Sequence, residues 1–129
     1  MRRISIGQVL LIHKYLIEVS GGVDGIRDYR LLDSAVQAPF QTFDGEDLYP
    51  GSMLKAAALC FGLIQNHPFI DGNKRIGVHM LDVFLQINGI HLQYSDEDLV
   101  ELGFSVADGV WGYAEILAWI SKHTSEAAT

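Results

Sequence analysis

The sequence predicts an all-α protein, a single-domain compact bundle of about six helices, and three observations support this. Apolar residues recur at helical spacing over most of the 129 positions. Glycines and prolines separate the helical segments. Hydrophobic residues make up 49% of the chain, which at this length is enough for a core without disulfide bonds. We therefore expect one domain over residues 1–124, followed by a flexible C-terminal tail over residues 125–129.

Two helices are expected before the first proline. Ser5 is a typical N-cap residue, and the apolar positions that follow it approximate one face of a helix. The pair Gly21–Gly22 ends this helix. A second helix begins after Asp28, again a capping residue type, and ends at Pro39.

A long connection from Pro39 to Gly51 follows, and loops of this length in small domains are often functional. Within it, 41–43 is expected to be extended, and Asp44–Gly45 is a typical hairpin turn. Ser52 is then expected to cap a third helix, from Met53 to about Asn66. Because this helix is apolar on nearly every side, it should be the central one.

The end of the third helix and the bounds of the fourth follow from a proline and from asparagines. Pro68 disfavours helical geometry at the residue before it, so the third helix should end at His67. Asn73 is expected to cap a fourth helix that ends at Asn88–Gly89.

The last two helices have equally local signals. Ser95 and Asp98 resemble a capping box that opens the fifth helix. The sixth covers Tyr113 to about His123, with its apolar residues at helical spacing.

Charge and cysteine content exclude several classes of function. The chain has 16 acidic and nine basic residues, a net charge of −7, which argues against direct nucleic-acid binding. Cys60 is the only cysteine, so no intramolecular disulfide and no multi-thiolate zinc site is expected, and its apolar neighbours predict a buried thiol. The longest apolar run, 56–64, is too short to span a membrane, and no signal peptide is expected, so we expect a cytoplasmic protein.

The segment from His67 to Arg75 combines the residue types that phosphoryl or nucleotidyl transfer requires. Unpaired N–H groups at a helix start form an anion site, and Gly72 lets the backbone approach a ligand closely. Lys74 and Arg75 add positive charge. Asp71 is suited to hold Mg²⁺ against phosphates, and His67 to take a proton from an attacking hydroxyl.

Each of these residues also has a purely structural interpretation. Asn73 would serve as a helix cap, Asp71 as a turn residue and His67 as a C-terminal cap. Lys74 and Arg75 would then be solvated surface residues.

The other histidines are weaker candidates. His13, His91 and His123 have no evident partners in the sequence and are expected at the surface or half-buried. His79 lies one turn beyond Arg75 on a polar helix face, where it is a candidate for the border of a nucleotide crevice. No H-E-x-x-H occurs, so a zinc hydrolase has little support.

Residues 67–75 resemble the Fic motif, H-P-F-x-[D/E]-G-N-x-R, at every defined position. Further segments are similar to the Doc (death-on-curing) branch of the Fic/Doc superfamily: residues 1–5, 25–28, 45–50 and 84–89. The resemblance covers residues 1–123. It implies the helical Fic/Doc fold, with a flap loop before the central helix.

The resemblance implies a role for each motif residue. His67 would be the base that deprotonates a target hydroxyl, Phe69 the buried anchor of the loop, and Asp71 the ligand of Mg²⁺. ATP would be the co-substrate. Its phosphates would be bound by Gly72, Asn73, Lys74 and Arg75.

The motif combines features of two reactions. Fic enzymes that transfer AMP typically have glycine between the motif asparagine and arginine, where this chain has Lys74, as Doc toxins do. In the family, lysine at this position goes with a nucleotide bound in the reversed orientation, so that the γ-phosphate is transferred. Gly72, in contrast, is typical of AMP-transferring motifs, whereas Doc toxins often carry alanine there. We favour phosphoryl transfer, with AMP transfer as the alternative.

The loop between the second and third helices corresponds to the family's flap, which pairs with an extended segment of the target protein. Its contacts with the target would be Thr42, Phe43 and Asp44. The alternative is an ordinary surface loop that Phe40 and Phe43 hold against the core.

The resemblance further implies a toxin of a type II toxin–antitoxin system that modifies a host protein, with the translation machinery as the expected target. Self-inhibiting Fic proteins carry a helix of the form [S/T]-x-x-x-E-[G/N], but the nearest match here, Thr42–Asp47, ends in aspartate. Inhibition is therefore expected from a separate cognate antitoxin. A catalytically silent partner-binding module is the second alternative.

Overall fold

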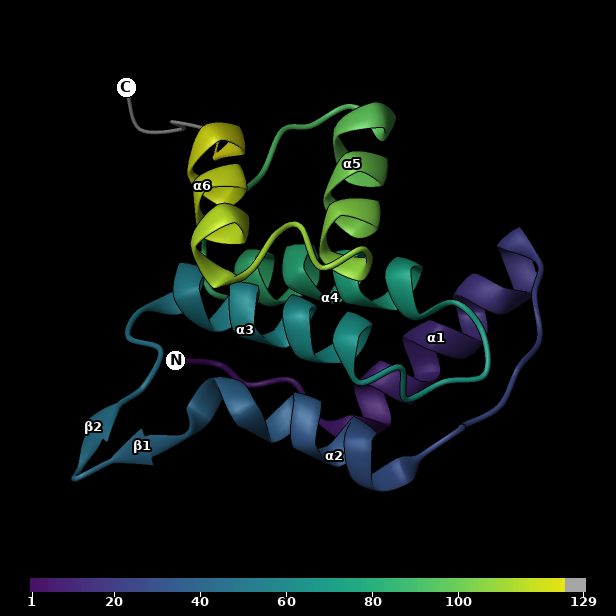
Figure 1. The fold of residues 1–129 in the computed structure, drawn as a ribbon, viewed down its shortest axis with the longest axis horizontal. Coiled ribbons are helices and arrows are strands. Elements are labelled where there is room, and N and C mark those ends of the chain that lie inside the picture. The colour runs from purple at the N-terminus through teal and green to yellow at the C-terminus, as the bar shows by residue number, and fades with distance from the viewer. Residues whose placement is uncertain (125–129) are drawn as a thin grey trace.

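The computed structural model describes residues 1–124, and in this range six helices pack into one bundle (Figure 1). The all-α prediction is confirmed, while the predicted tail over 125–129 lies outside the described residues. In chain order the elements are α1 (Ile6–Ser20), α2 (Tyr29–Gln37), the 3-10 helix η1 (Ala38–Phe40), β1 (Thr42–Phe43), β2 (Glu46–Asp47), α3 (Ser52–Gln65), α4 (Asn73–Ile87), α5 (Asp96–Ala107) and α6 (Tyr113–His123).

Helix α3 is central, as its apolar composition predicts. It contacts α2, α4, α5 and α6, and its buried residues include Cys60 and Leu63. Helices α3 and α4 approach closely at Gly77, where an added Cβ would lie 2.5 Å from the Ile64 side chain. This packing sets the two helices side by side, so that the loop joining them is held at one end of the bundle (Figure 1).

Local capping signals place several helix starts correctly. Ser5 forms a capping box with Gln8 at the start of α1, and the Asp28 side chain accepts the Leu31 N–H at the start of α2. Ser95 and Asp98 form the predicted capping box of α5. These bonds satisfy N–H groups that the helix itself leaves unpaired.

Two predicted caps are wrong. Helix α3 begins at Ser52 itself, and the N-cap position belongs to Gly51, which has φ +82°. Helix α4 begins at Asn73, and Gly72 is the N-cap residue. The Asn73 side chain does not cap the helix because its amide is bonded back to the loop before it. Helix α3 also ends at Gln65, two residues before His67, whose φ is +50°.

The connection before α3 contains the predicted hairpin, with Thr42 paired to Asp47 and Phe43 to Glu46. Its base is fixed by Lys55 of α3, a buried side chain whose ammonium group donates to the Asp47 carboxylate at 2.9 Å and to the Tyr49 carbonyl. The hairpin lies at the N-terminal end of α3, opposite the α3–α4 loop (Figure 1).

Within residues 1–124, no helix combines the length and the apolar character needed to cross a membrane.

Candidate functional site

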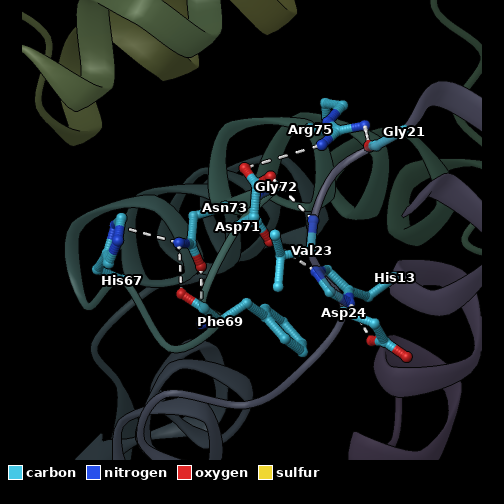
Figure 2. Close-up of polar contacts among 10 residues, drawn as sticks. All are labelled: His13, Gly21, Val23, Asp24, His67, Phe69, Asp71, Gly72, Asn73 and Arg75. Carbon is cyan, nitrogen blue, oxygen red and sulfur yellow. Dashed lines mark hydrogen bonds and ion pairs between the residues drawn. The ribbon is translucent and has the colours of Figure 1, made fainter.

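The α3–α4 loop lies against two segments that precede it in the chain by about 40 residues or more (Figure 2). The Ile70 N–H donates to the Gly25 carbonyl, and the Arg27 N–H donates to the Pro68 carbonyl at 2.7 Å. The Arg27 side chain donates to the carbonyl of His67 at 2.6 Å. Arg27, which lies in one of the segments similar to the Doc branch, therefore holds the backbone of the loop in place.

Asn73 closes the loop with a fork of hydrogen bonds. Its Oδ1 accepts the Phe69 N–H at 2.9 Å, and its Nδ2 donates to the Phe69 carbonyl at 2.9 Å (Figure 2). These two bonds fix the orientation of the amide, because the reversed amide would place Nδ2 against the N–H and Oδ1 against the carbonyl. The second N–H of Nδ2 then faces Nδ1 of His67 at 3.1 Å.

This contact settles the protonation pattern of neutral His67. Nδ1 faces a donor, so it accepts, and the ring proton resides on Nε2. The ring is exposed and the residue has the positive φ noted above, so the side chain projects from the loop rather than packing into the core.

Phe69 lies beneath the loop, with 1% of its surface exposed. Its ring stacks on His13 of α1, with centroids 3.7 Å apart and planes inclined by 8° (Figure 2). His13 is itself 1% exposed, and its Nε2 donates to the Asp71 carbonyl at 2.7 Å.

The expectation that His13 is partnerless and near the surface is therefore wrong. His13 shares its helix face with Val9, Leu16 and Ile17, which are all buried. That spacing was a signal for burial, but a polar residue within an apolar stripe does not reveal its partner 58 positions later. His123 also has partners, since its Nδ1 bonds to the Trp119 carbonyl and its Nε2 lies 3.3 Å from Asp98.

The Asp71 carboxylate is held by backbone N–H groups from two segments. Val23 donates to Oδ2 at 3.1 Å, and Gly72 donates to Oδ1 at 2.8 Å. These two bonds, followed by the charge of Arg75, lower the pKa of Asp71 below its ordinary value, so the group is ionised at neutral pH. The side chain is 46% exposed and therefore open to a ligand.

Arg75 lies beside this carboxylate. One guanidinium nitrogen donates to the Gly21 carbonyl at 2.8 Å, and the other lies 3.9 Å from Asp71 Oδ1. Gly72, with φ +80°, brings the backbone into the same space, where an added Cβ would lie 3.3 to 3.4 Å from Ile17, Arg75 and His13. The loop after α1, residues 21–23, is thus part of the site, although its glycines predicted only a helix end.

Two recesses border these residues. One, of about 110 Å³, is lined by His67 and by residues 71–74. The other, of about 180 Å³, lies between α4 and α5 and is mainly apolar, with Lys74, Arg75, His79 and Phe104 in its wall. Exposed Lys74 borders both, and its ammonium group lies 5.0 Å from the centre of the Phe104 ring. Burial lowers the pKa of His79, an effect that nearby Asp82 opposes, so His79 is neutral at pH 7.

The predicted flap residues are not brought to this site. Thr42, Phe43 and Asp44 are exposed in the hairpin at the far end of α3, and 14 helical residues correspond to about 21 Å. Phe43 is 76% exposed, so it does not hold the loop against the core.

The carboxylate of Asp71 fits a hard divalent cation whose other ligands come from phosphate. Among the described residues, no three His, Cys, Asp or Glu side chains are grouped as a metal cage. A single ionised, half-exposed carboxylate beside an arginine instead suits Mg²⁺, which is commonly held by one or two carboxylates together with phosphate oxygens and water.

Comparison with known proteins places these features in a wider group. The model of the Fic/DOC family matches residues 3–85. A curated protein of Mycolicibacterium smegmatis, named Toxin Doc, is 49% identical over 72 residues. The match covers 56% of this chain and 55% of that protein, so the aligned region spans about half the length of each.

Proposed function

The chain belongs to the Fic/DOC family, and on this basis we propose that it is a Doc-like toxin that transfers the γ-phosphoryl group of ATP to a hydroxyl of a host protein. The observation that carries the proposal is the grouping of an exposed histidine, an ionised aspartate and an arginine around one helix start. The 49% identity to a protein named Toxin Doc supports the assignment to the toxin branch.

The phosphates are proposed to bind at the start of α4. The first N–H groups of this helix have no partner within it, and the helix dipole favours negative charge there. Arg75 is placed to grip phosphate oxygens, exchanging its bond to Gly21 for a stronger charge-assisted one. Asp71 would hold Mg²⁺, which when bound neutralises phosphate charge.

His67 is proposed to receive the proton of the attacking hydroxyl. In the transfer, a bond forms between the hydroxyl oxygen and the γ-phosphorus, the bond to the β-phosphate oxygen breaks, and ADP leaves. In the tautomer that Asn73 favours, Nε2 carries the proton and Nδ1 is the nitrogen that can accept another. The exposed ring therefore has to turn away from Asn73 before it accepts the proton.

The apolar recess between α4 and α5 is proposed to take the nucleobase. It adjoins the two cations of the motif, and the exposed Phe104 ring in its wall offers a stacking surface. Its wall includes His79, whose neutral ring suits contact with an uncharged base.

The hairpin is proposed to pair with an extended segment of the target protein. A strand bound to β1 would need about six residues to run from the hairpin to His67, at about 3.3 Å per residue. Such a span requires an unfolded loop or terminus in the target rather than a folded surface.

A separate antitoxin is proposed to inhibit the enzyme in the cytoplasm. The nearest match to a self-inhibiting helix, Thr42–Asp47, forms the hairpin β1–β2 and so has no helix to offer. Co-expression tests this part: relief of growth arrest by a small protein encoded beside the toxin supports it, and persistent arrest contradicts it.

Labelled ATP and a cell lysate test the reaction. With the wild-type chain we expect label from γ-labelled ATP on a lysate protein. With His67→Ala we expect none. Label from α-labelled ATP would instead show AMP transfer, to which Gly72 points. No transfer from either, with ATP still bound, would leave the silent binding module as the function.

A further inference from the structure

His13 contacts the α3–α4 loop at two points on either side of Ile70. Its ring stacks on Phe69, and its Nε2 donates to the Asp71 carbonyl at 2.7 Å. A carbonyl only accepts, so Nε2 carries the proton in this arrangement. A nearly inaccessible polar ring with both a stacking and a hydrogen-bonding partner is a fixed support for the loop.

The same histidine also faces the loop that follows α1. Its Nδ1 lies 3.7 Å from the carboxylate of Asp24, whose neighbour Val23 donates its N–H to Asp71 Oδ2. His13 thus lies where three segments meet: α1, residues 21–24 and the α3–α4 loop (Figure 2). The backbone of Asp71 is held by His13, and its carboxylate by Val23 and Gly72.

We infer that His13 is a positioning residue, which together with the close approach of Gly22 sets the orientation of the Asp71 carboxylate toward a metal-bound nucleotide. This inference rests on the proposed function, because that function makes Asp71 the metal ligand. Partners that orient a metal ligand typically change metal affinity about 10–100-fold when they are lost. His13 is such a partner for Asp71, although it touches neither metal nor nucleotide.

Gly22 supplies an independent observation. An added Cβ there would lie 2.6 Å from Asp71 Oδ2 and 2.9 Å from an Arg75 nitrogen, so only glycine allows this approach. Gly89, just after the end of α4, also has a positive φ, but nothing lies within 4 Å of its Cβ position. Gly89→Ala therefore adds backbone strain alone, and Gly22→Ala adds strain together with displacement of the carboxylate.

The test measures the dissociation constant of ATP by calorimetry, once with Mg²⁺ and once with EDTA. The ratio of the constant in EDTA to the constant with Mg²⁺ reports the metal-dependent part of binding. We expect Asp71→Asn to bring this ratio to one. His13→Phe retains the stack on Phe69 but not the hydrogen bond, and it should reduce the ratio about tenfold. Affinity in EDTA should stay unchanged. His13→Gln restores a donor near Nε2 and should recover most of the ratio.

The loop variants give the same test without altering the core. Gly22→Ala should reduce the ratio about tenfold, as His13→Phe does, while Gly89→Ala should not. Because Gly22 is exposed, its variant tests the approach of the 21–23 loop even where His13→Phe does not fold, and His13→Gln then tests the histidine.

The outcomes separate the inference from the proposed function. A wild-type ratio in both His13→Phe and Gly22→Ala, or equal losses with Mg²⁺ and EDTA, overturns the positioning role alone. If wild-type protein binds ATP equally with and without Mg²⁺, both the metal assignment and the positioning role fall.

Discussion

The side-chain amide of Asn73 donates to Nδ1 of His67 at 3.1 Å, and it is locked in that orientation by both backbone polar groups of Phe69. The proton of neutral His67 is consequently on Nε2. This tautomer is measurable without a substrate, and it bears on the base role proposed for His67.

Nitrogen NMR of labelled histidine rings tests this relationship. With its ring uncharged, His67 should show the Nε2–H tautomer, with the Nδ1 resonance shifted by a hydrogen bond. Asn73→Ala should shift the tautomer ratio toward that of exposed His91, because the directing donor is gone. A dominant Nδ1–H form of His67 in the wild-type protein would contradict the geometry.

Phe104 offers a test of the nucleobase recess. Phe104→Ala should weaken ATP binding about tenfold, which lies within the range of about 1–3 kcal/mol seen for loss of an aromatic stacking partner of a base. Binding of inorganic tripolyphosphate, which has no base, should not change. Val110→Ala, at another exposed apolar position, is the matched control. Equal losses for ATP and tripolyphosphate would place the base elsewhere.

The ion pair between Lys55 and Asp47 predicts an asymmetry in stability. Asp47→Ala leaves a buried ammonium group without its carboxylate and should cost about 2 kcal/mol in the free energy of unfolding. Lys55→Met removes the same pair but leaves no buried charge, so its cost should be smaller.

Denaturant unfolding of these variants and of the double variant measures the difference. Adding Lys55→Met to Asp47→Ala should recover part of the lost stability. An Asp47→Ala variant as stable as wild type would show that solvent replaces the carboxylate.

Cys60 reports on the packing of α3. Burial raises the pKa of its thiol to about 12, so almost no thiolate forms at pH 8. Iodoacetamide at that pH should leave the folded protein unmodified and alkylate it completely in guanidinium chloride. Rapid alkylation of the native protein would mean that the α3 core opens readily.

The local part of this fold is accessible from the sequence. Ser5, Asp28 and Ser95 lie at helix starts because their side chains each accept the N–H group three residues ahead, a pattern visible along the chain. The start of α6 at Tyr113 and its end at His123 were likewise predicted.

The supports of the site are not accessible in that way. Asn73 was expected to cap its helix, because the sequence does not show that its amide finds Phe69 instead. His13, Val23 and Arg27 act on residues 40 to 58 positions away, through tertiary contacts that no local pattern encodes. The motif predicts which groups would react, and the structure identifies the residues that hold these groups in place.

Mass spectrometry of a modified host protein tests the central claim most directly. A lysate protein incubated with the wild-type chain, ATP and Mg²⁺ should gain about 80 Da on one hydroxyl-bearing residue, the mass of a transferred phosphoryl group. His67→Ala should give no gain. An increase of about 329 Da would show transfer of AMP and contradict the proposed reaction.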